Sequence, residues 1–317
     1  MLKTLNLFFL IIFFAQINFA QTESFLSLKT ESGTLYGTMQ VPDNKNNIPL
    51  VILVPDSKTD NSFDENLQNQ AFKSLADSLS LRGIASIRYD KRGFGKSAVA
   101  SRNGANLSIE IFVSDLNGWV NRFAANKKFT EIILVGHGEG ALVAVICAAE
   151  NKNVRKFVSL EGAGLPRADI LREQMQIQFE QQPQLREIAE NYIKKLSKGE
   201  IIDELVPQKL FKYFPPNLNR LFISWFKYNP QTEIAKLKIP VLIIQGDADA
   251  QVSMSNANLL AQANVNAKKI VINEMNHVFR KCSSTHPLSQ YSANCKPDTP
   301  IKSELCRAIA EFIFEKE

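Results

Sequence analysis

Residues 135–140 read VGHGEG, and the fold prediction starts from this short stretch. An apolar run, EIIL, precedes the stretch, and a second apolar run, ALVAVICAA, follows it. This layout predicts a buried strand, a sharp glycine-rich turn and a helix. Gly138 stands in the middle of the turn, where glycine tolerates a positive φ but presents no side chain.

Other strand-sized runs lie on both sides of this turn. The first two, 24–30 and 33–42, alternate between apolar and polar residues and predict an antiparallel hairpin. The later runs are nearly continuous, as in strands covered on both faces, and span 49–55, 83–90, 131–136, 156–162, 240–247 and 268–274. Helical patterns span 67–81, 107–123, 138–150, 256–263 and 302–314. We therefore expect an α/β fold with a mostly parallel, doubly wound sheet and an N-terminal antiparallel hairpin.

The segment 165–238 interrupts the alternation of strands and helices. It holds two amphipathic helical stretches and then an aromatic-rich stretch, without a strand-like run. We expect a helical cap insertion over the C-terminal edge of the sheet, where it would roof a pocket. Most of its aromatic side chains would fix the insertion to the main body, and one or two would face the pocket.

The first twenty residues are typical of a signal peptide. Lys3 gives a positive start, an apolar core of 11 residues follows (LNLFFLIIFFA), and Ala20 precedes a plausible cleavage point before Gln21. This core is too short for a comfortable membrane span, so we expect a mature α/β domain over 21–317 that is secreted or periplasmic. We expect no stable membrane insertion after the leader is removed. A membrane-anchoring N-terminus is the alternative interpretation.

Charge and cysteine content bear on the partners, the disulfides and the metal sites that the chain is expected to have. The chain has 37 basic and 32 acidic residues spread along its length, which does not indicate a nucleic-acid partner. Cys282 and Cys295 bracket a polar loop, and a disulfide that closes this loop is the preferred pairing in an exported protein. Cys147 and Cys306 fall in helical patterns and are expected to be buried thiols, with a bond between them as the alternative. The sequence implies no metal and no organic cofactor.

Three chemistry-bearing turns follow strand runs. They are VGHGEG, then QGDADAQV with Asp247 and Asp249, and then EMNHVF with His277. Because the carboxyl ends of parallel strands meet at one edge of a sheet, these turns should form one site. His277 needs an acid that orients its ring, and Asp249 is the candidate. Asp247 is the alternative acid, although its position favours a role in capping the turn.

The order of these turns resembles the α/β-hydrolase fold family, in particular exported esterases and serine-aminopeptidase-like hydrolases with a GHSEG elbow. YDKRGFGKS (89–97) is similar to a loop of that family, GHGEG (136–140) matches the elbow at every position but one, and GDADAQV and MNHV supply the acid and the histidine. The resemblance covers nearly the whole mature chain. It implies that Gly138 occupies the nucleophile position, with Asp249 and His277 as the catalytic acid and base.

Because glycine stands at the position of the nucleophile, the sequence leads to one preferred function and two alternatives. Loss of such a nucleophile typically lowers turnover by about a million-fold, so we expect impaired or absent serine-type catalysis at Gly138. The backbone N–H groups of Glu139 and Ser57 are the candidate oxyanion donors, although Asp56 brings a negative charge close to them. One alternative is an active esterase or peptidase-like hydrolase that uses water or another nucleophile, of which a displaced Ser57 is the less favoured form. A second alternative is a binding module without turnover; the ligand expected in each case is a small ester, amide or acyl compound.

Overall fold

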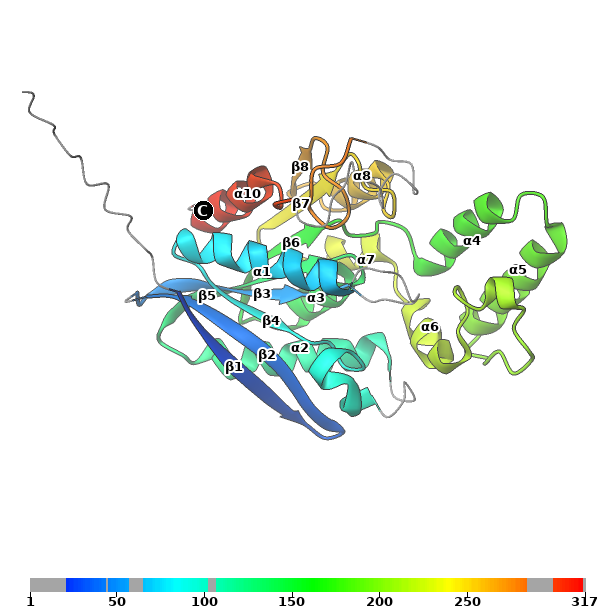
Figure 1. The fold of residues 1–317 in the computed structure, drawn as a ribbon, viewed down its shortest axis with the longest axis horizontal. Coiled ribbons are helices and arrows are strands. Elements are labelled where there is room, and N and C mark those ends of the chain that lie inside the picture. Colours follow the sequence, from blue (N-terminus) through cyan, green and yellow to red (C-terminus); the bar gives the residue numbers. More distant parts are fainter. Residues whose placement is uncertain (1–20, 44, 57–64, 102–106, 284–298, 316–317) are drawn as a thin grey trace, which may run out of the picture.

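The computed structural model describes residues 21–315, apart from 44, 57–64, 102–106 and 284–298. Within this part, the chain forms one sheet of eight strands in the order β1-β2-β4-β3-β5-β6-β7-β8 (Figure 1). The strands are β1 (Gln21–Thr30), β2 (Gly33–Pro42), β3 (Ile48–Val54), β4 (Ala85–Tyr89), β5 (Phe129–His137), β6 (Val154–Leu160), β7 (Val241–Gly246) and β8 (Lys268–Ile272). Each strand coincides with one of the runs expected from the sequence.

The sheet is parallel from β4 through β3 to β8, and the N-terminal hairpin forms its antiparallel edge. β1 pairs with β2, and β2 pairs antiparallel with β4. Parallel pairing places Val54 beside Gly136 and His137 beside Leu160, so β3, β5 and β6 end at the same edge. The expected fold class is therefore confirmed.

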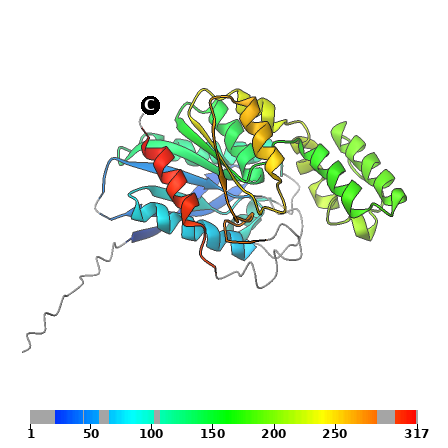
Figure 2. The ribbon, with the colours of Figure 1, turned by 90° about the horizontal axis from the view of Figure 1, so that it is seen from above.

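Helices cover both faces of the sheet (Figures 1 and 2). One face contacts α1 (Glu65–Leu81) and α10 (Ser303–Phe314), and the other contacts α2 (Ile109–Ala124), α3 (Glu139–Glu150) and α8 (Met254–Ala263). Strand side chains alternate between the two cores: Ile52 belongs to the α2–α3 side, and Val51 and Leu53 belong to the α1–α10 side. This double coverage explains the continuous apolar runs in the sequence.

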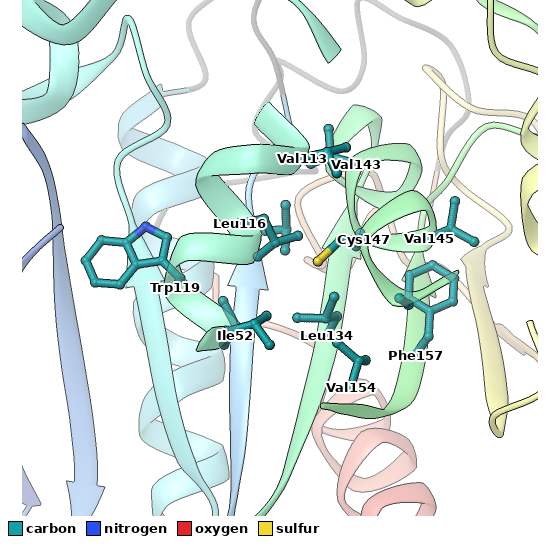
Figure 3. Close-up of a cluster of buried hydrophobic side chains, with 14 of the residues drawn as sticks. Ile52, Val113, Leu116, Trp119, Leu134, Val143, Val145, Cys147, Val154 and Phe157 are labelled. Carbon is teal, nitrogen blue, oxygen red and sulfur yellow. The ribbon is translucent and has the colours of Figure 1, made fainter. Parts of the chain in front are cut away.

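The core on the α2–α3 side shows how these helices are fixed. Trp119 and Leu116 of α2 lie above Ile52 and Leu134 of the sheet, and Cys147 of α3 lies in the same cluster (Figure 3). All five side chains are fully buried. This rigid packing fixes the start of α3, and with it the position of the elbow at Gly138.

The predicted insertion lies between β6 and β7. It contains α4 (Arg167–Gln178), α5 (Pro183–Ser197), α6 (Asn219–Trp225) and α7 (Pro230–Ala235), with short 3-10 turns at Gln208–Leu210 and Pro216–Leu218. A third 3-10 turn, Gly95–Ser101, lies elsewhere, after β4. α4 and α5 extend away from the sheet (Figure 1). The insertion has a hydrophobic core of its own, built from residues such as Leu171, Tyr192, Leu210 and Phe214.

Cys147 and Cys306 are buried free thiols, as expected. Cys295, Ser57 and residues 1–20 lie outside the described residues, so the predictions on them stay predictions. Across the described ranges, none of the helices has the length and apolar character that crossing a bilayer requires.

Candidate active site

The turn between β5 and α3 has the geometry of a strand-to-helix elbow. Gly138 has φ 55° and ψ −121°, a conformation that L-residues with a side chain rarely adopt. Gly140 allows the first turn of α3 to approach the end of β3, since a Cβ on Gly140 would lie only 2.3 Å from the carbonyl oxygen of Val54. The glycines of VGHGEG thus bring the start of α3 against the end of β3.

Asp249 and His277 meet at the same edge of the sheet. Oδ2 of Asp249 lies 2.8 Å from Nδ1 of His277. Oδ1 of Asp249 accepts the backbone N–H groups of Gln251 (2.7 Å) and Val252 (3.0 Å), which orients the carboxylate. Asp247 instead accepts the backbone N–H of Glu274 (2.6 Å). The acid beside the histidine is therefore Asp249, and Asp247 fixes the neighbouring turn.

His137, inside the elbow, supports His277. Nε2 of His137 lies 2.9 Å from the carbonyl oxygen of His277, and the centroids of the two rings are 4.5 Å apart. Burial and the adjacent His277 lower the pKa of His137 to about 3, so its ring is neutral. His137 is thus a packing and hydrogen-bonding residue.

The side chain of Asp56 fills the space above Gly138. A Cβ on Gly138 would lie 2.4 Å from Cγ of Asp56, far inside van der Waals contact. Oδ1 of Asp56 accepts the backbone N–H of Glu139 (2.6 Å), and Oδ2 lies 3.5 Å from Nε2 of His277. From the sequence we expected this negative charge near the oxyanion site. In the structure the carboxylate of Asp56 also occupies the position of the absent nucleophile, which the sequence did not reveal.

His277 therefore lies between two carboxylates. Burial opposes its positive charge, but the charge and hydrogen bond of Asp249 and the carboxylate of Asp56 raise the pKa of His277 to about 10. Burial opposes ionisation of Asp56 as well, yet the hydrogen bond and positive charge of His277 and the backbone N–H of Glu139 bring the pKa of Asp56 well below its usual value. Near neutral pH the cluster is an Asp–His–Asp triplet with a protonated ring and two ionised carboxylates.

A cavity of about 170 Å³ opens onto this triplet. Its floor comes from the sheet side and includes Asp56, Gly138, Glu139, Leu142 and His277. Its roof comes from the insertion and includes Leu165, Arg167, Ile170, Gln174, Lys212, Tyr213 and Trp225. The insertion thus covers the strand-end site, and the cavity suits a small molecule with apolar and polar parts.

A buried ion pair fixes the residue after the elbow. Nζ of Lys91 lies 2.5 Å from Oε1 of Glu139, and both side chains are almost fully buried. Nζ of Lys91 also lies 4.3 Å from the centroid of the Phe112 ring. The next residue of the loop, Arg92, forms a bidentate pair with Asp115 (2.8 and 2.5 Å). The family-like loop at 89–97 therefore ties β4 to the elbow and to α2.

Glu161, directly after β6, carries a buried carboxyl group that was not among the site residues predicted from the sequence. Its Oε1 accepts the backbone N–H of Gly246 (2.9 Å), and its Oε2 accepts the side-chain amide of Gln245. Burial and the charge of Asp249 raise the pKa of Glu161 well above its usual range. The rule that strand ends carry function would have pointed to both residues, since Asp56 follows the predicted strand 49–55 and Glu161 lies near the end of the predicted strand 156–162.

One known protein family and one bacterial esterase are similar in sequence to this chain. Residues 66–197 match the family described as serine aminopeptidase, S33. The chain is 25% identical over 299 residues to Esterase EstD of Thermotoga maritima, which covers 92% of this chain and 69% of that protein. The chain is thus similar to esterase-like proteins, and the fold described above is the α/β-hydrolase fold.

Solved structures show the same fold. A structure of Est1E from Butyrivibrio proteoclasticus with bound ferulic acid aligns over 91% of this chain and 97% of its own, at 17% identity and a TM-score of 0.61. A bromoperoxidase from Bacillus anthracis aligns over 92% of this chain and all of its own, at 18% identity and a TM-score of 0.56.

The donor set of the site does not resemble a metal centre. Within the described ranges, no group of three or more His, Cys, Asp or Glu side chains is placed to hold a metal ion. The polar groups of the cavity suit proton transfer and the binding of an organic molecule.

Proposed function

We propose that this protein binds a small ester-, amide- or acyl-type molecule in the cap-covered cavity and performs no serine-type acyl transfer. One observation carries the proposal: the carboxylate of Asp56 stands where a nucleophile on Gly138 would stand. Asp56 also uses the backbone N–H of Glu139, which would otherwise stabilise the oxyanion of an acyl substrate. The chain thus lacks the serine, and the backbone N–H of Glu139, an expected oxyanion donor, already donates to Asp56.

The esterase-like relatives support the choice of ligand class. One structural neighbour, Est1E, holds ferulic acid, and a sequence relative is named an esterase. The cavity here has both apolar and cationic walls, with Leu142 and Ile170 beside Arg167 and Lys212. Such walls suit a small organic molecule that carries an oxygen-rich or anionic end.

Hydrolysis by a different nucleophile is the second candidate function, and the geometry of His277 favours it. The bond between Asp249 and His277, at 2.8 Å, is the arrangement that a general base needs. A chain that only bound a ligand would not need this pair. Asp56, water or Ser57 would then have to act in place of the serine.

Two measurements on the parent protein test the absence of serine-type transfer. We expect no turnover of p-nitrophenyl acetate or butyrate above the buffer rate, with an active serine esterase as the positive control. We also expect no covalent labelling by a fluorophosphonate probe. Turnover at ordinary esterase rates, or labelling of any serine in the cavity, would overturn the proposal. Labelling mapped to Ser57 would identify it as a displaced nucleophile.

We further propose that residues 1–20 direct export and that Cys282 pairs with Cys295 in the oxidised mature protein. The apolar leader sequence and the buried position of Cys282 support these proposals. N-terminal sequencing of the processed protein and peptide mapping without reduction test them. A retained leader, or a free thiol at Cys282 after oxidative folding, would contradict them.

A further inference from the structure

Glu161 adopts a backbone conformation that residues with a side chain rarely take. Its φ is 52°, in the left-handed region that favours glycine, and its backbone N–H donates to the carbonyl oxygen of Ile244 (3.0 Å). The side chain is completely buried, and its Oε1 accepts the backbone N–H of Gly246 (2.9 Å). Strained residues of this kind cluster at sites where the side chain has a function. The backbone of Glu161 thus aims a buried carboxyl group at the turn after β7.

The carboxyl groups of Glu161 and Asp249 meet at the side-chain amide of Gln245. Nε2 of Gln245 contacts Oε2 of Glu161 and lies 3.3 Å from Oδ2 of Asp249. The same nitrogen donates to the carbonyl oxygen of Val252 (2.8 Å). An amide nitrogen carries two hydrogens, and the two nearer oxygens, on Glu161 and Val252, use them. The amide therefore offers little to the carboxylate of Asp249, which needs another donor on this side.

The orientation of the Gln245 amide follows from these acceptors. Its Oε1 is buried and, within the described ranges, has no hydrogen-bond partner. Rotation of the amide by half a turn would instead place Oε1 among the oxygens of Glu161, Asp249 and Val252. Contacts between acceptors are unfavourable in a buried site. Gln245 therefore donates to the cluster and accepts nothing from it.

Glu161 and Asp249 are also hydrogen-bonded directly to each other. An ionised carboxylate only accepts hydrogen bonds, so a bond between two carboxyl groups requires a proton on one of them. The charges lead to the same conclusion. Within the described residues, the ring of His277 pairs with Asp249, and no Lys or Arg forms an ion pair with either carboxyl group. A second negative charge here would be buried without a partner, which is strongly unfavourable.

The proton belongs to Glu161 and not to Asp249. Oδ2 of Asp249 lies 2.8 Å from Nδ1 of His277. Its Oδ1 accepts two backbone N–H groups, from Gln251 and Val252. These contacts favour the ionised form of Asp249. Glu161 instead faces the negative charge of Asp249, and burial together with this charge raises the pKa of Glu161 well above its usual range.

We propose that Glu161 is a positioning residue that holds a proton at neutral pH and donates it to Asp249, which in turn orients the ring of His277. The inference goes beyond the proposed function and does not depend on whether the site turns over a substrate. The O–H group of Glu161 gives the Asp249 carboxylate a donor besides the backbone. It also leaves one negative charge on this side of the ring instead of two. Glu161 thereby fixes the direction of the His277 ring and limits the charge that holds its proton.

Few titratable groups surround this pair. Asp249 contacts Glu161 directly, and His277 contacts Asp249. Asp247, in the same turn, instead accepts the backbone N–H of Glu274. α8, which packs against β7, contains no titratable side chain. Loss of the Glu161 proton, expected only in alkaline solution, would therefore place a second negative charge beside Asp249 and strengthen the hold on the His277 proton.

The first measurement uses the full chain of the parent protein at pH 7. Infrared spectroscopy should show the C=O band of a buried, protonated carboxyl group, and ¹³C labelling of glutamate should shift this band. The label separates Glu161 from Asp115, whose pKa is also raised by burial. The band should be lost in Glu161→Gln and kept in the matched control Glu233→Gln. Glu233 is also a buried glutamate, but it pairs with Lys236 (2.6 Å).

The second measurement is an NMR titration of His277. Glu161→Gln keeps the charge of the pair and a donor for Asp249, so the pKa of His277 should stay within about half a unit of the parent value. Glu161→Leu is also uncharged but has no donor. The hydrogen bond between Asp249 and His277 should then strengthen, and the Nδ1 proton resonance should move downfield. Glu161→Gln should keep the parent resonance, which a purely structural role of the side chain would not require.

Three outcomes would overturn the proposal. The first is the absence of a protonated glutamate band at pH 7. The second is a pKa of His277 that falls by about one unit or more in Glu161→Gln, since a negative charge would then have been removed. The third is the same Nδ1 resonance in Glu161→Gln and Glu161→Leu. If a Glu161 variant does not fold, the glutamate band of the parent protein decides. None of these readouts uses an ester or a fluorophosphonate, so this inference and the proposed function can fail separately.

Discussion

The carboxylate of Asp56 occupies the volume that a side chain on Gly138 would need, with 2.4 Å between Cγ and an ideal Cβ. The two residues come from different strands, β3 and β5, and the sheet register brings the strand ends together. The space left by the missing side chain at Gly138, after β5, is thus filled by the side chain of Asp56, after β3. The replacement by Asp56 explains why simple restoration of the serine should fail.

We predict that Gly138→Ser alone gains no esterase activity, because the new side chain meets the carboxylate of Asp56. The double variant Gly138→Ser with Asp56→Gly should gain activity on p-nitrophenyl butyrate. It regains a hydroxyl near His277 and frees the N–H of Glu139 for an oxyanion. The gain should reach at least about tenfold over the single variant, measured as kcat/KM. Equal activity in both variants would show that Asp56 does not obstruct the site.

We predict that Gly138→Ala destabilises the protein more than Gly199→Ala. Both glycines have a positive φ (55° and 82°), so both substitutions cost about 1–2 kcal/mol in backbone strain. A Cβ on Gly199 meets nothing within 4 Å, whereas a Cβ on Gly138 meets Asp56. The extra cost at Gly138 should therefore shrink when Asp56 is also changed to Gly. Urea unfolding of Gly138→Ala, Gly199→Ala, Asp56→Gly and the double variant Gly138→Ala with Asp56→Gly checks this. An equal cost at both glycines would contradict the steric account.

We predict that the stabilising contribution of His277 disappears at high pH. The pKa of its ring is raised from the usual value of about 6.5 to about 10 in the folded protein. A raised pKa gives stability that is fully present below about pH 6.5 and is lost as the pH rises through about 10. The difference in free energy of unfolding between the parent and His277→Gln should fall by on the order of 5 kcal/mol from below to above this window. An NMR titration should find a lower pKa for His277 in Asp56→Asn, because one of the two carboxylate charges is removed.

We predict that the ion pair of Arg92 and Asp115 is needed for stability. Both side chains are nearly fully buried, at 2% and 6% exposure, and removal of one leaves a buried charge without its partner. Asp115→Ala should cost about 3 kcal/mol or more in the free energy of unfolding. The matched control is Glu23→Gln, in the half-exposed pair with Arg88, which should cost less than about 1 kcal/mol. Similar losses in both variants would refute the role of burial.

We predict that Glu161→Gln is tolerated and that Glu161→Ala is not. The carboxyl group has a strongly raised pKa, so the folded protein favours its neutral form, which glutamine resembles. Glutamine also keeps an oxygen for the backbone N–H of Gly246, whereas alanine leaves that donor unsatisfied at a cost of about 1–3 kcal/mol. Thermal unfolding at pH 7 compares the two variants. A glutamine variant as unstable as the alanine variant would mean that the ionised form is required.

The sheet and its helices could be predicted from the sequence because burial on both faces leaves a direct pattern. The runs at 49–55 and 131–136 are nearly continuously apolar, since α1 and α10 cover one side and α2 and α3 the other. The meeting of Asp249 and His277 could also be predicted, because parallel strands end at one edge. The hydrogen bonds of the structure distinguish the two aspartates, since Asp249 contacts His277 and Asp247 accepts the backbone N–H of Glu274. These are the roles that the sequence favoured.

The position of the Asp56 side chain could not be predicted, because it depends on how the loop after β3 turns towards α3. That approach requires Gly140, whose missing side chain lets the carbonyl of Val54 come close. Glu161 was missed for a different reason. Glutamate is rarely buried, and here the amide of Gln245 and the backbone N–H of Gly246 donate hydrogen bonds to the carboxyl group of Glu161. Both cases depend on three-dimensional partners that lie far apart in the chain.

The cavity wall is divided between two hydrophobic cores. Asp56 and His277 are held by the sheet, whereas Ile170 and Tyr213 belong to an insertion with a separate core. Substitutions in the insertion can therefore alter which molecules enter without disturbing the groups beneath. Related proteins could therefore differ in the molecules that they bind while Asp56 and His277 stay the same. They could equally differ at these two residues while the insertion stays the same.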